Sequence, residues 1–155
     1  MTEHGRPLDW YATLDDVPWL RTPRRIYLAS SWRNPDQPTL VKRLRGAGHK
    51  VYDFRNPAPG KAGFSWPQTG HDALTIDGYR AAMDSGVAVD GFSLDWRGLN
   101  WCDTCILALP CGRSAHLEAG WCAGSGRRVI WVLNEAGWEP ELMYRLGHDF
   151  VRSAA

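Results

Sequence analysis

The sequence has neither a long hydrophobic run nor an excess of one charge sign. Its 155 residues include 18 Lys and Arg against 17 Asp and Glu, for a formal net charge of +1. A transmembrane helix needs ~20 consecutive apolar residues, and nucleic acids or anionic membranes attract an excess of positive charge. The first residues are polar and acidic, unlike a secretory signal. We therefore expect a cytoplasmic protein that binds no nucleic-acid polymer and no membrane.

Cysteine is scarce, and its spacing completes no zinc-site pattern. The four cysteines are Cys102, Cys105, Cys111 and Cys122. The first two have a C-x-x-C spacing, but neither a second pair nor a histidine pair accompanies them. We expect reduced structural thiols, and a site that needs no metal and no organic cofactor.

Glycine is missing where two familiar enzyme motifs require it. No glycine lies between Ala29 and Arg45, whereas a dinucleotide-binding fingerprint needs three after the first strand. The segment 112–116, Gly-Arg-Ser-Ala-His, lacks the second glycine of a Gly-x-Ser-x-Gly nucleophile elbow. These absences argue against a Rossmann dehydrogenase and against an α/β-hydrolase.

Apolar runs alternate with helical patterns along most of the chain. Strands are predicted at 25–29, 49–54, 105–109, 129–133 and, more briefly, 150–151. Helices are predicted at 39–45, 75–85, 90–101, after the loop at 110–112, and at 140–146. This alternation predicts a doubly wound α/β fold, with a parallel sheet of about five strands and helices on both faces. Residues 1–24 form an N-terminal arm, and residues 25–155 form a single α/β domain.

The most informative stretch is 110–120, Pro-Cys-Gly-Arg-Ser-Ala-His-Leu-Glu-Ala-Gly. It follows a predicted buried strand and begins a helix, so Glu118 falls near the carboxyl end of that strand. Ligands bind at this edge in open α/β sheets, and the positive end of the helix dipole favours an ionised carboxylate. Glu118 is therefore a candidate for chemistry, although a surface glutamate that complements the dipole is the plainer alternative.

Three further groups are predicted to converge on the same sheet edge. The loop after the first strand offers hydroxyls, N–H groups and a guanidinium that suit a phosphate, from Ser30, Ser31, Trp32 and Arg33. Asp95 would accept hydrogen bonds from a base, with Asp103 eight residues later, although Asp103 also suits a turn or cap. Tyr27 would reach a carboxylate with its hydroxyl, or simply pack.

Together these pieces resemble the nucleoside 2-deoxyribosyltransferase superfamily, which includes the 2′-deoxynucleoside 5′-phosphate N-hydrolases. The matching segments are 26–33, the pair Asp95 and Asp103, and 116–121. In that family a glutamate followed by a small residue and glycine is the nucleophile, and Glu118 matches it. The resemblance implies a flavodoxin-like sheet and a homo-oligomer.

The resemblance also implies roles for the other residues. Tyr27 matches the tyrosine that orients the nucleophile, and Asp95 matches the aspartate that contacts the base. The Ser31-x-Arg33 segment resembles the phosphate-binding loop of the nucleotide hydrolases. The transferases carry an additional aspartate before the nucleophile, where this chain has Arg113 and Ser114. We expect those two residues to bind substrate in a different way.

The function that follows is cleavage or transfer at an N-glycosidic bond. The substrate would be a small-molecule nucleoside or nucleoside 5′-monophosphate, and the intermediate a covalent glycosyl-glutamate. Two alternatives of the same flavodoxin-like layout stay open. One is a Toll/interleukin-receptor-like enzyme that cleaves NAD, and the other is a non-catalytic nucleotide-binding or assembly module.

Overall fold

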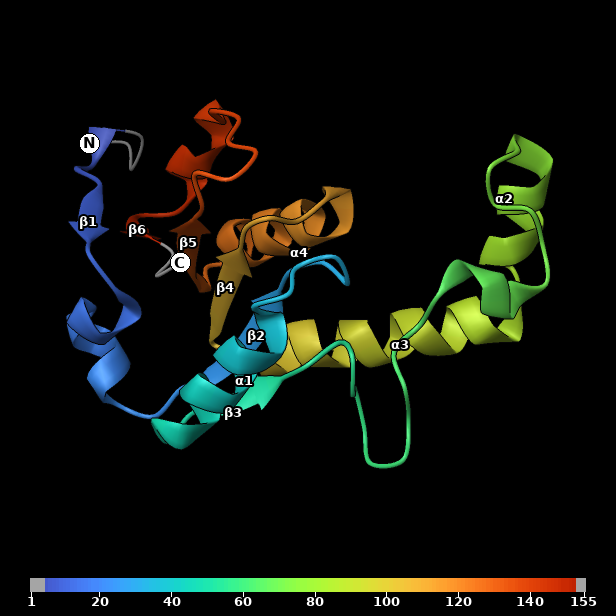
Figure 1. Ribbon diagram of the computed structural model, residues 1–155, viewed down its shortest axis with the longest axis horizontal. Helices are drawn as coiled ribbons and strands as arrows, with labels where there is room; N and C mark the ends of the chain where they lie inside the picture. The colour runs from blue at the N-terminus through green and yellow to red at the C-terminus, as the bar shows by residue number, and fades with distance from the viewer. Residues whose placement is uncertain (1–4, 153–155) are drawn as a thin grey trace. The chain divides into compact units, whose positions relative to one another are not determined.

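The computed structural model describes residues 5–152 and separates the chain into two compact units. The first unit combines residues 1–52 with 102–155, and the second is the continuous segment 53–101. Figure 1 follows the chain from the first unit, through the second, and back into the first. The division into an arm, 1–24, and a single domain, 25–155, stays a prediction; the described part of the arm belongs to the first unit.

The first unit is built on a sheet of six parallel strands. In chain order they are β1 Asp9–Tyr11, β2 Arg25–Ala29, β3 Lys50–Tyr52, β4 Thr104–Ala108, β5 Arg128–Leu133 and β6 Asp149–Arg152. Their order in space is β1-β6-β5-β4-β2-β3, and every neighbouring pair is parallel. Without β1 this is the 2-1-3-4-5 order of flavodoxin-like sheets. The predicted fold class is confirmed, with six strands instead of about five.

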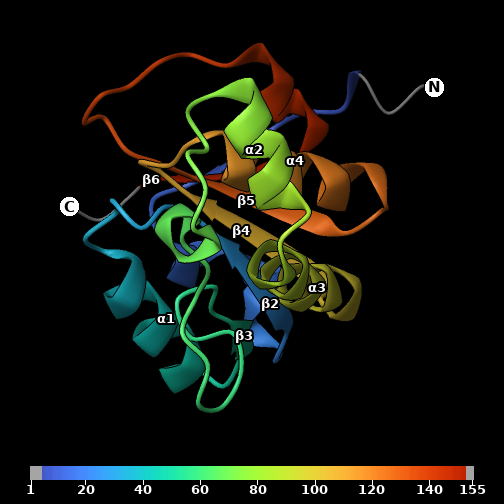
Figure 2. The same ribbon diagram turned by 90° about the vertical axis from the view of Figure 1, so that its right-hand side faces the viewer.

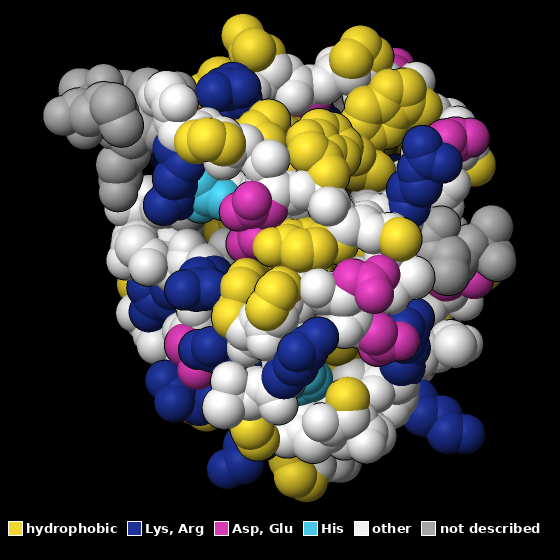
Figure 3. Space-filling model, turned by 90° about the vertical axis from the view of Figure 1, so that its left-hand side faces the viewer, with side chains coloured by type: hydrophobic (Ala, Val, Ile, Leu, Met, Phe, Trp, Pro, Cys, Tyr) yellow, Lys and Arg dark blue, Asp and Glu magenta, His cyan; other side chains and the backbone are white. Residues whose placement is uncertain are grey.

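The strand missing from the prediction is β1, which lies within the arm. Its three residues are too few to show an alternating pattern, and the chain places it beside its last strand, with Trp10 opposite Phe150. The Trp10 ring stacks on Phe150 at 4.5 Å between centroids, yet stays 65% exposed. Figure 3 views this side of the molecule, where hydrophobic side chains gather across the upper part of the surface.

One face of the sheet carries the aliphatic core. Alternate strand residues point to this face, where they pack with α1 (Gln37–Gly46) and the short helices η2 (Leu14–Asp16) and η3 (Pro18–Arg21). The buried cluster comprises Leu14, Val17, Leu20, Ile26, Leu28, Val41, Leu44, Val51, Ile106, Ala108, Ile130, Val132 and Val151. Because Val41 and Leu44 are one helical turn apart, one side of α1 rests on the sheet.

The opposite face is covered by α4 (Arg113–Gly124) and the 3-10 helix η5 (Leu142–Leu146). The buried residues of α4 are Ala115, Ala119 and Cys122, at i, i+4 and i+7. Since all three side chains are small, the helix backbone lies close to β4 and β5. Figure 2 shows α1 and α4 on opposite sides of the strands. The start of α4 is thus fixed against the middle of the sheet.

The second unit contains η4 (Trp66–Thr69), α2 (Ile76–Met83) and α3 (Gly86–Trp101). Thr75 caps α2 by accepting a hydrogen bond from the Gly78 N–H at 3.0 Å. Gly91 leaves room for Phe64, because a Cβ there would stand 2.9 Å from the Phe64 Cβ. None of the helices within residues 5–152 is both long and apolar enough to cross a bilayer.

Candidate active site

The candidate site lies where the connections from two central strands leave the sheet in opposite directions. β2 and β4 are neighbours, and the chain leaves β2 toward α1 on one face but leaves β4 toward α4 on the other. Such a switch point opens a crevice at the carboxyl ends of the strands. The two loops that diverge here are residues 30–36 and 109–112.

Hydrogen bonds tie the first of these loops to the end of β4. The Ser30 hydroxyl donates to the Ala108 carbonyl at 2.8 Å, and the Asn34 amide donates to the Ser30 oxygen at 3.0 Å. Asn34 is 2% exposed, and its side-chain oxygen Oδ1 accepts a hydrogen bond from the Asp36 N–H at 3.0 Å. The Ser30 hydroxyl therefore holds the shape of the loop, and its predicted contact with substrate stays a prediction. Sequence reasoning missed Asn34, whose signal was the turn-forming pair Asn34-Pro35.

Arg33 reaches from the first loop to the second. The Ser31 hydroxyl accepts a hydrogen bond from the Arg33 N–H at 3.1 Å, which closes a tight turn. The Arg33 side chain is exposed, and its Nη2 atom lies 3.9 Å from where a Cβ would stand on Gly112. The guanidinium therefore lies beside the residue that precedes α4.

The first turns of α4 carry three of the predicted residues. Arg113 and Ser114 are exposed at its first two positions, and Glu118 is half-buried one turn after Ser114. Burial and the nearby negative charge of Glu118 raise the pKa of the Cys111 thiol to about 12. Cys111 is therefore a neutral thiol at physiological pH and a poor nucleophile. The same interaction places the Glu118 carboxylate near the loop that precedes α4.

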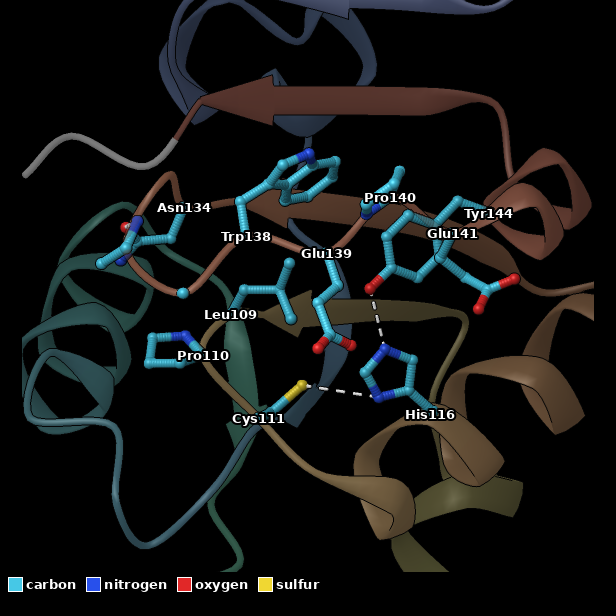
Figure 4. Close-up of a pocket in the computed structure, with 12 residues that line it drawn as sticks. Leu109, Pro110, Cys111, His116, Asn134, Trp138, Glu139, Pro140, Glu141 and Tyr144 are labelled. Atoms are coloured by element: carbon cyan, nitrogen blue, oxygen red, sulfur yellow. Dashed lines mark hydrogen bonds between the residues drawn. The ribbon is translucent and has the colours of Figure 1, made fainter.

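A histidine and a tyrosine form a second polar group beside this loop. The His116 ring contacts the Gly112 carbonyl through Nδ1 at 2.7 Å and the Tyr144 hydroxyl through Nε2 at 2.8 Å. The Cys111 sulfur lies 3.8 Å from Nδ1. Figure 4 marks this contact with a dashed line. Tyr144 comes from η5, 28 residues further along the chain, and no local signal in the sequence pointed to it.

These side chains border a small pocket of about 170 Å³. In Figure 4 the Glu139 side chain extends toward Cys111 and His116. The lining residues are Leu109, Pro110, Cys111, His116, Asn134, Ala136, Gly137, Trp138, Glu139, Pro140, Glu141 and Tyr144. The pocket thus lies next to the predicted reactive loop, on the side of α4 that faces η5.

Tyr27 lies in β2, on the face of the sheet that α4 covers. It is fully buried, and its ring stacks on Tyr52 at 5.0 Å between centroids with 14° between planes. Its strand neighbours Ile26 and Leu28 belong to the aliphatic core on the other face. Tyr27 therefore shares a face with the helix that carries Glu118, while its predicted role of orienting that carboxylate stays a prediction.

Asp103 does not join the other predicted residues. It lies at the amino end of β4, where its carboxylate accepts hydrogen bonds from the Arg25 N–H at 3.3 Å and the Thr104 hydroxyl at 2.8 Å. The length of β4, roughly 15 Å, separates it from the edge that carries the start of α4. Asp103 thus anchors the beginnings of β2 and β4, away from the edge that carries Glu118, and its predicted contact with substrate stays a prediction.

Trp32 and Asp95 are the two remaining residues that the sequence predicted for the site. Trp32 is 51% exposed in the loop with Arg33. Asp95 is half-buried on α3 in the second unit, and its contact with a base stays a prediction.

Across residues 5–152, no group of three or more His, Cys, Asp and Glu side chains is arranged to hold a metal ion. All four cysteines are free thiols.

Comparison with known proteins identifies the fold. No protein-family model matches the sequence, and no curated protein matches it. The structure is similar to that of the CMP N-glycosidase BcmB from Clostridium botulinum, with a TM-score of 0.51 and 16% sequence identity. The match covers 84% of this chain and 88% of that chain. The likeness shows that the two proteins share a fold, and this fold is the flavodoxin-like α/β layout that the sequence resemblance implied.

Proposed function

We propose that this protein cleaves the N-glycosidic bond of a nucleoside 5′-monophosphate, with Glu118 as the nucleophile. The observation that carries the proposal is the approach of Arg33 to Gly112, directly before the helix that bears Glu118. A guanidinium and a carboxylate thus lie on either side of the start of α4 at the switch point. The structural likeness to a CMP N-glycosidase supports this choice of substrate class.

The phosphate would bind between the two loops. The Arg33 guanidinium offers paired N–H donors that fit a phosphate, and Ser31 belongs to the same turn. Arg113 and Ser114 are exposed at the start of α4, where the helix dipole favours an anion. Glu118 follows Gly112 by six residues, or about 9 Å along the helix axis. That spacing leaves the sugar between phosphate and carboxylate.

The reaction would proceed in two displacements. A Glu118 carboxylate oxygen forms a bond to the anomeric carbon while the carbon–nitrogen bond breaks, and the base leaves with that electron pair and takes up a proton. Asp95 is the proposed contact of the base, and Tyr27 the proposed support of Glu118. Water then attacks the anomeric carbon, releases the sugar phosphate and restores the carboxylate. Attack by a second base in place of water would make the enzyme a transferase.

The direct test is an incubation with CMP, dCMP, UMP, cytidine and NAD, followed by chromatography for released bases. We expect free base from a nucleoside monophosphate, with slower release from cytidine. Release of nicotinamide alone would favour the NAD-cleaving alternative. Binding of every compound without cleavage would favour a non-catalytic module. Adding a second free base to the reaction and looking for a new nucleotide separates transfer from hydrolysis.

The assignment of the nucleophile is tested by Glu118→Gln. This variant keeps the size of the side chain but removes its charge, so kcat is expected to fall by about a thousandfold or more, as loss of a nucleophile does elsewhere. Glu135→Gln is the control, because Glu135 is exposed outside the switch point. Its activity should match the wild type. Full activity of Glu118→Gln would contradict the proposal.

A further inference from the structure

The contacts of His116 determine which tautomer its neutral ring adopts. A carbonyl oxygen only accepts hydrogen bonds, so the 2.7 Å contact with Gly112 places a hydrogen on Nδ1. In the neutral ring, Nε2 then accepts from the Tyr144 hydroxyl at 2.8 Å. Burial raises the pKa of Tyr144 to about 12, which keeps that hydroxyl protonated at neutral pH. Donors and acceptors therefore match along the whole path from Tyr144 to Gly112.

The Tyr144 end of this hydrogen-bonded chain packs against the sheet. The Tyr144 ring is stacked between two others, against Trp131 of β5 at 4.6 Å and against His116 at 5.7 Å. Trp131 is 2% exposed in the middle of the sheet. The position of the imidazole is thus set by a rigid strand, and not only by its own helix.

The near end of the path is the peptide that joins Gly112 to Arg113. A peptide group is planar, and its carbonyl and N–H point in opposite directions. When His116 holds the Gly112 carbonyl, it therefore also fixes the Arg113 N–H at the first position of α4, next to the residue that Arg33 approaches. Gly112 has no side chain with which to cap α4. The histidine thus provides a restraint that this residue cannot supply itself.

We propose that His116 and Tyr144 are positioning residues for the N-glycosidase reaction. They hold the Gly112 peptide, and with it the spacing between Arg33, which would bind the phosphate, and Glu118, which would attack the sugar. This inference rests on the proposed function, but it assigns residues that the family resemblance did not. Neither residue needs to touch the substrate.

Two substitutions of His116 separate its two hydrogen bonds. The amide nitrogen of His116→Asn takes the place of Nδ1 and keeps the bond to Gly112. The longer His116→Gln places its amide near the former Nε2, so it reaches Tyr144 but not Gly112. Tyr144→Phe keeps the ring stack on Trp131 and removes only the hydroxyl. Thermal unfolding of each variant establishes that it is folded.

The readout is kcat/KM for CMP and for cytidine, since cytidine has no phosphate for Arg33. Loss of one hydrogen bond is worth about a five- to tenfold change. His116→Gln should therefore lower kcat/KM for CMP about five- to tenfold while changing cytidine much less. His116→Asn and Tyr144→Phe both keep the bond to Gly112 and lose only the bond between Nε2 and the Tyr144 hydroxyl, so both should lie between the wild type and His116→Gln. A folded His116→Gln enzyme with the wild-type ratio of CMP to cytidine would overturn the positioning role alone.

The two proposals fail in different ways. If the wild-type protein binds CMP without cleaving it, the proposed reaction is wrong, and dissociation constants for CMP and cytidine replace kcat/KM in the same comparison. The positioning role then predicts weaker CMP binding for His116→Gln, and equal binding overturns it. A wild-type protein that neither binds nor cleaves CMP overturns both proposals.

Discussion

Arg33 is exposed, yet its position is closely defined by its neighbours. Ser31 accepts from the Arg33 N–H, and the buried Asn34 holds the following residues against the end of β4. The guanidinium therefore extends from a rigid turn toward Gly112. Anion binding would therefore have to order the Arg33 side chain but not the backbone that carries it.

Replacing Arg33 tests its role at the residue scale. A hydrogen bond to a charged group contributes about 1.5–3 kcal/mol, so Arg33→Ala should raise KM for CMP about tenfold to a hundredfold. Cytidine should be affected little. Arg33→Lys keeps the charge but loses the paired donors, and should give an intermediate value. Lys42→Ala, an exposed cation on α1, is the control. Steady-state kinetics would measure all four proteins, and equal losses for both substrates would contradict a phosphate role.

At the residue scale, the sequence predicts which side chains lie at the candidate site more readily than which side chains contact one another. The Glu118 and Arg33 loops could be predicted because the pattern of strand, loop and helix places both at one sheet edge. Asp103 was misplaced because a position shortly before a strand was read as part of that same edge. Tyr144 escaped prediction because its partner His116 is distant in the chain, and pairing of this kind depends on tertiary packing.

At the scale of secondary-structure elements, His49 links the residues that directly precede β2 and β3. His49 is 7% exposed, and its Nδ1 accepts a hydrogen bond from the Arg24 N–H at 3.1 Å. Burial lowers the pKa of His49, and the positive charge of Arg24 lowers it further. The native protein thus favours the neutral imidazole.

This arrangement makes stability depend on pH in a defined direction. Between the lowered native pKa and the unfolded value of about 6.5, the unfolded chain binds more protons than the native one. The free energy of unfolding therefore decreases as the pH falls through that range, and His49 adds no further pH dependence below it. His49→Asn retains an acceptor but cannot be protonated, so its stability should decline less steeply toward acid. Urea unfolding from about pH 8 to about pH 5 measures this.

The control for this prediction is His71→Asn, because His71 is exposed in the second unit. Its stability should follow the wild-type dependence on pH. The prediction would be wrong if His49→Asn and the wild type showed parallel curves throughout that range.

The elements themselves were largely predictable where side-chain patterns were long. The strand predicted at 25–29 has the same limits in the structure, and the helix predicted over 90–101 begins slightly earlier, at Gly86. β1 was missed because three residues at a sheet edge, Asp9–Tyr11, carry too little pattern. Its place in the sheet depends on pairing with β6, a distant part of the sequence, and not on a pattern in its own three residues.

At the scale of the whole molecule, the helices of the second unit expose large hydrophobic side chains. On α2 and α3, and in the turn before them, large hydrophobic side chains are exposed at Leu74, Ile76, Met83, Val89 and Phe92. Leu74 is 97% exposed and Ile76 is 83% exposed. Exposed apolar patches of this kind often mark protein–protein contacts. The homo-oligomer that the family resemblance implied is therefore predicted to use this surface.

Light scattering after size-exclusion chromatography tests this prediction. The wild-type chain of 17.4 kDa should elute at twice its mass or more, while the double variant Ile76→Ser and Phe92→Ser should shift toward the monomer. Leu142→Ser is the control, because Leu142 is similarly exposed but lies in the first unit. A wild-type monomer at high concentration would contradict the prediction.

The pairing of β1 with β6 links the order of synthesis to the completion of the sheet. β1 begins at Asp9, yet its strand partner begins at Asp149, so the ribosome makes the first strand long before the last. At about 5–20 residues per second, that interval lasts about 7–30 s. Meanwhile the nascent chain holds Trp10 without the Phe150 ring on which it later stacks. The β1 edge of the sheet can therefore form only after β6 has been synthesised, and a chain truncated before β6 would leave β1 without this partner.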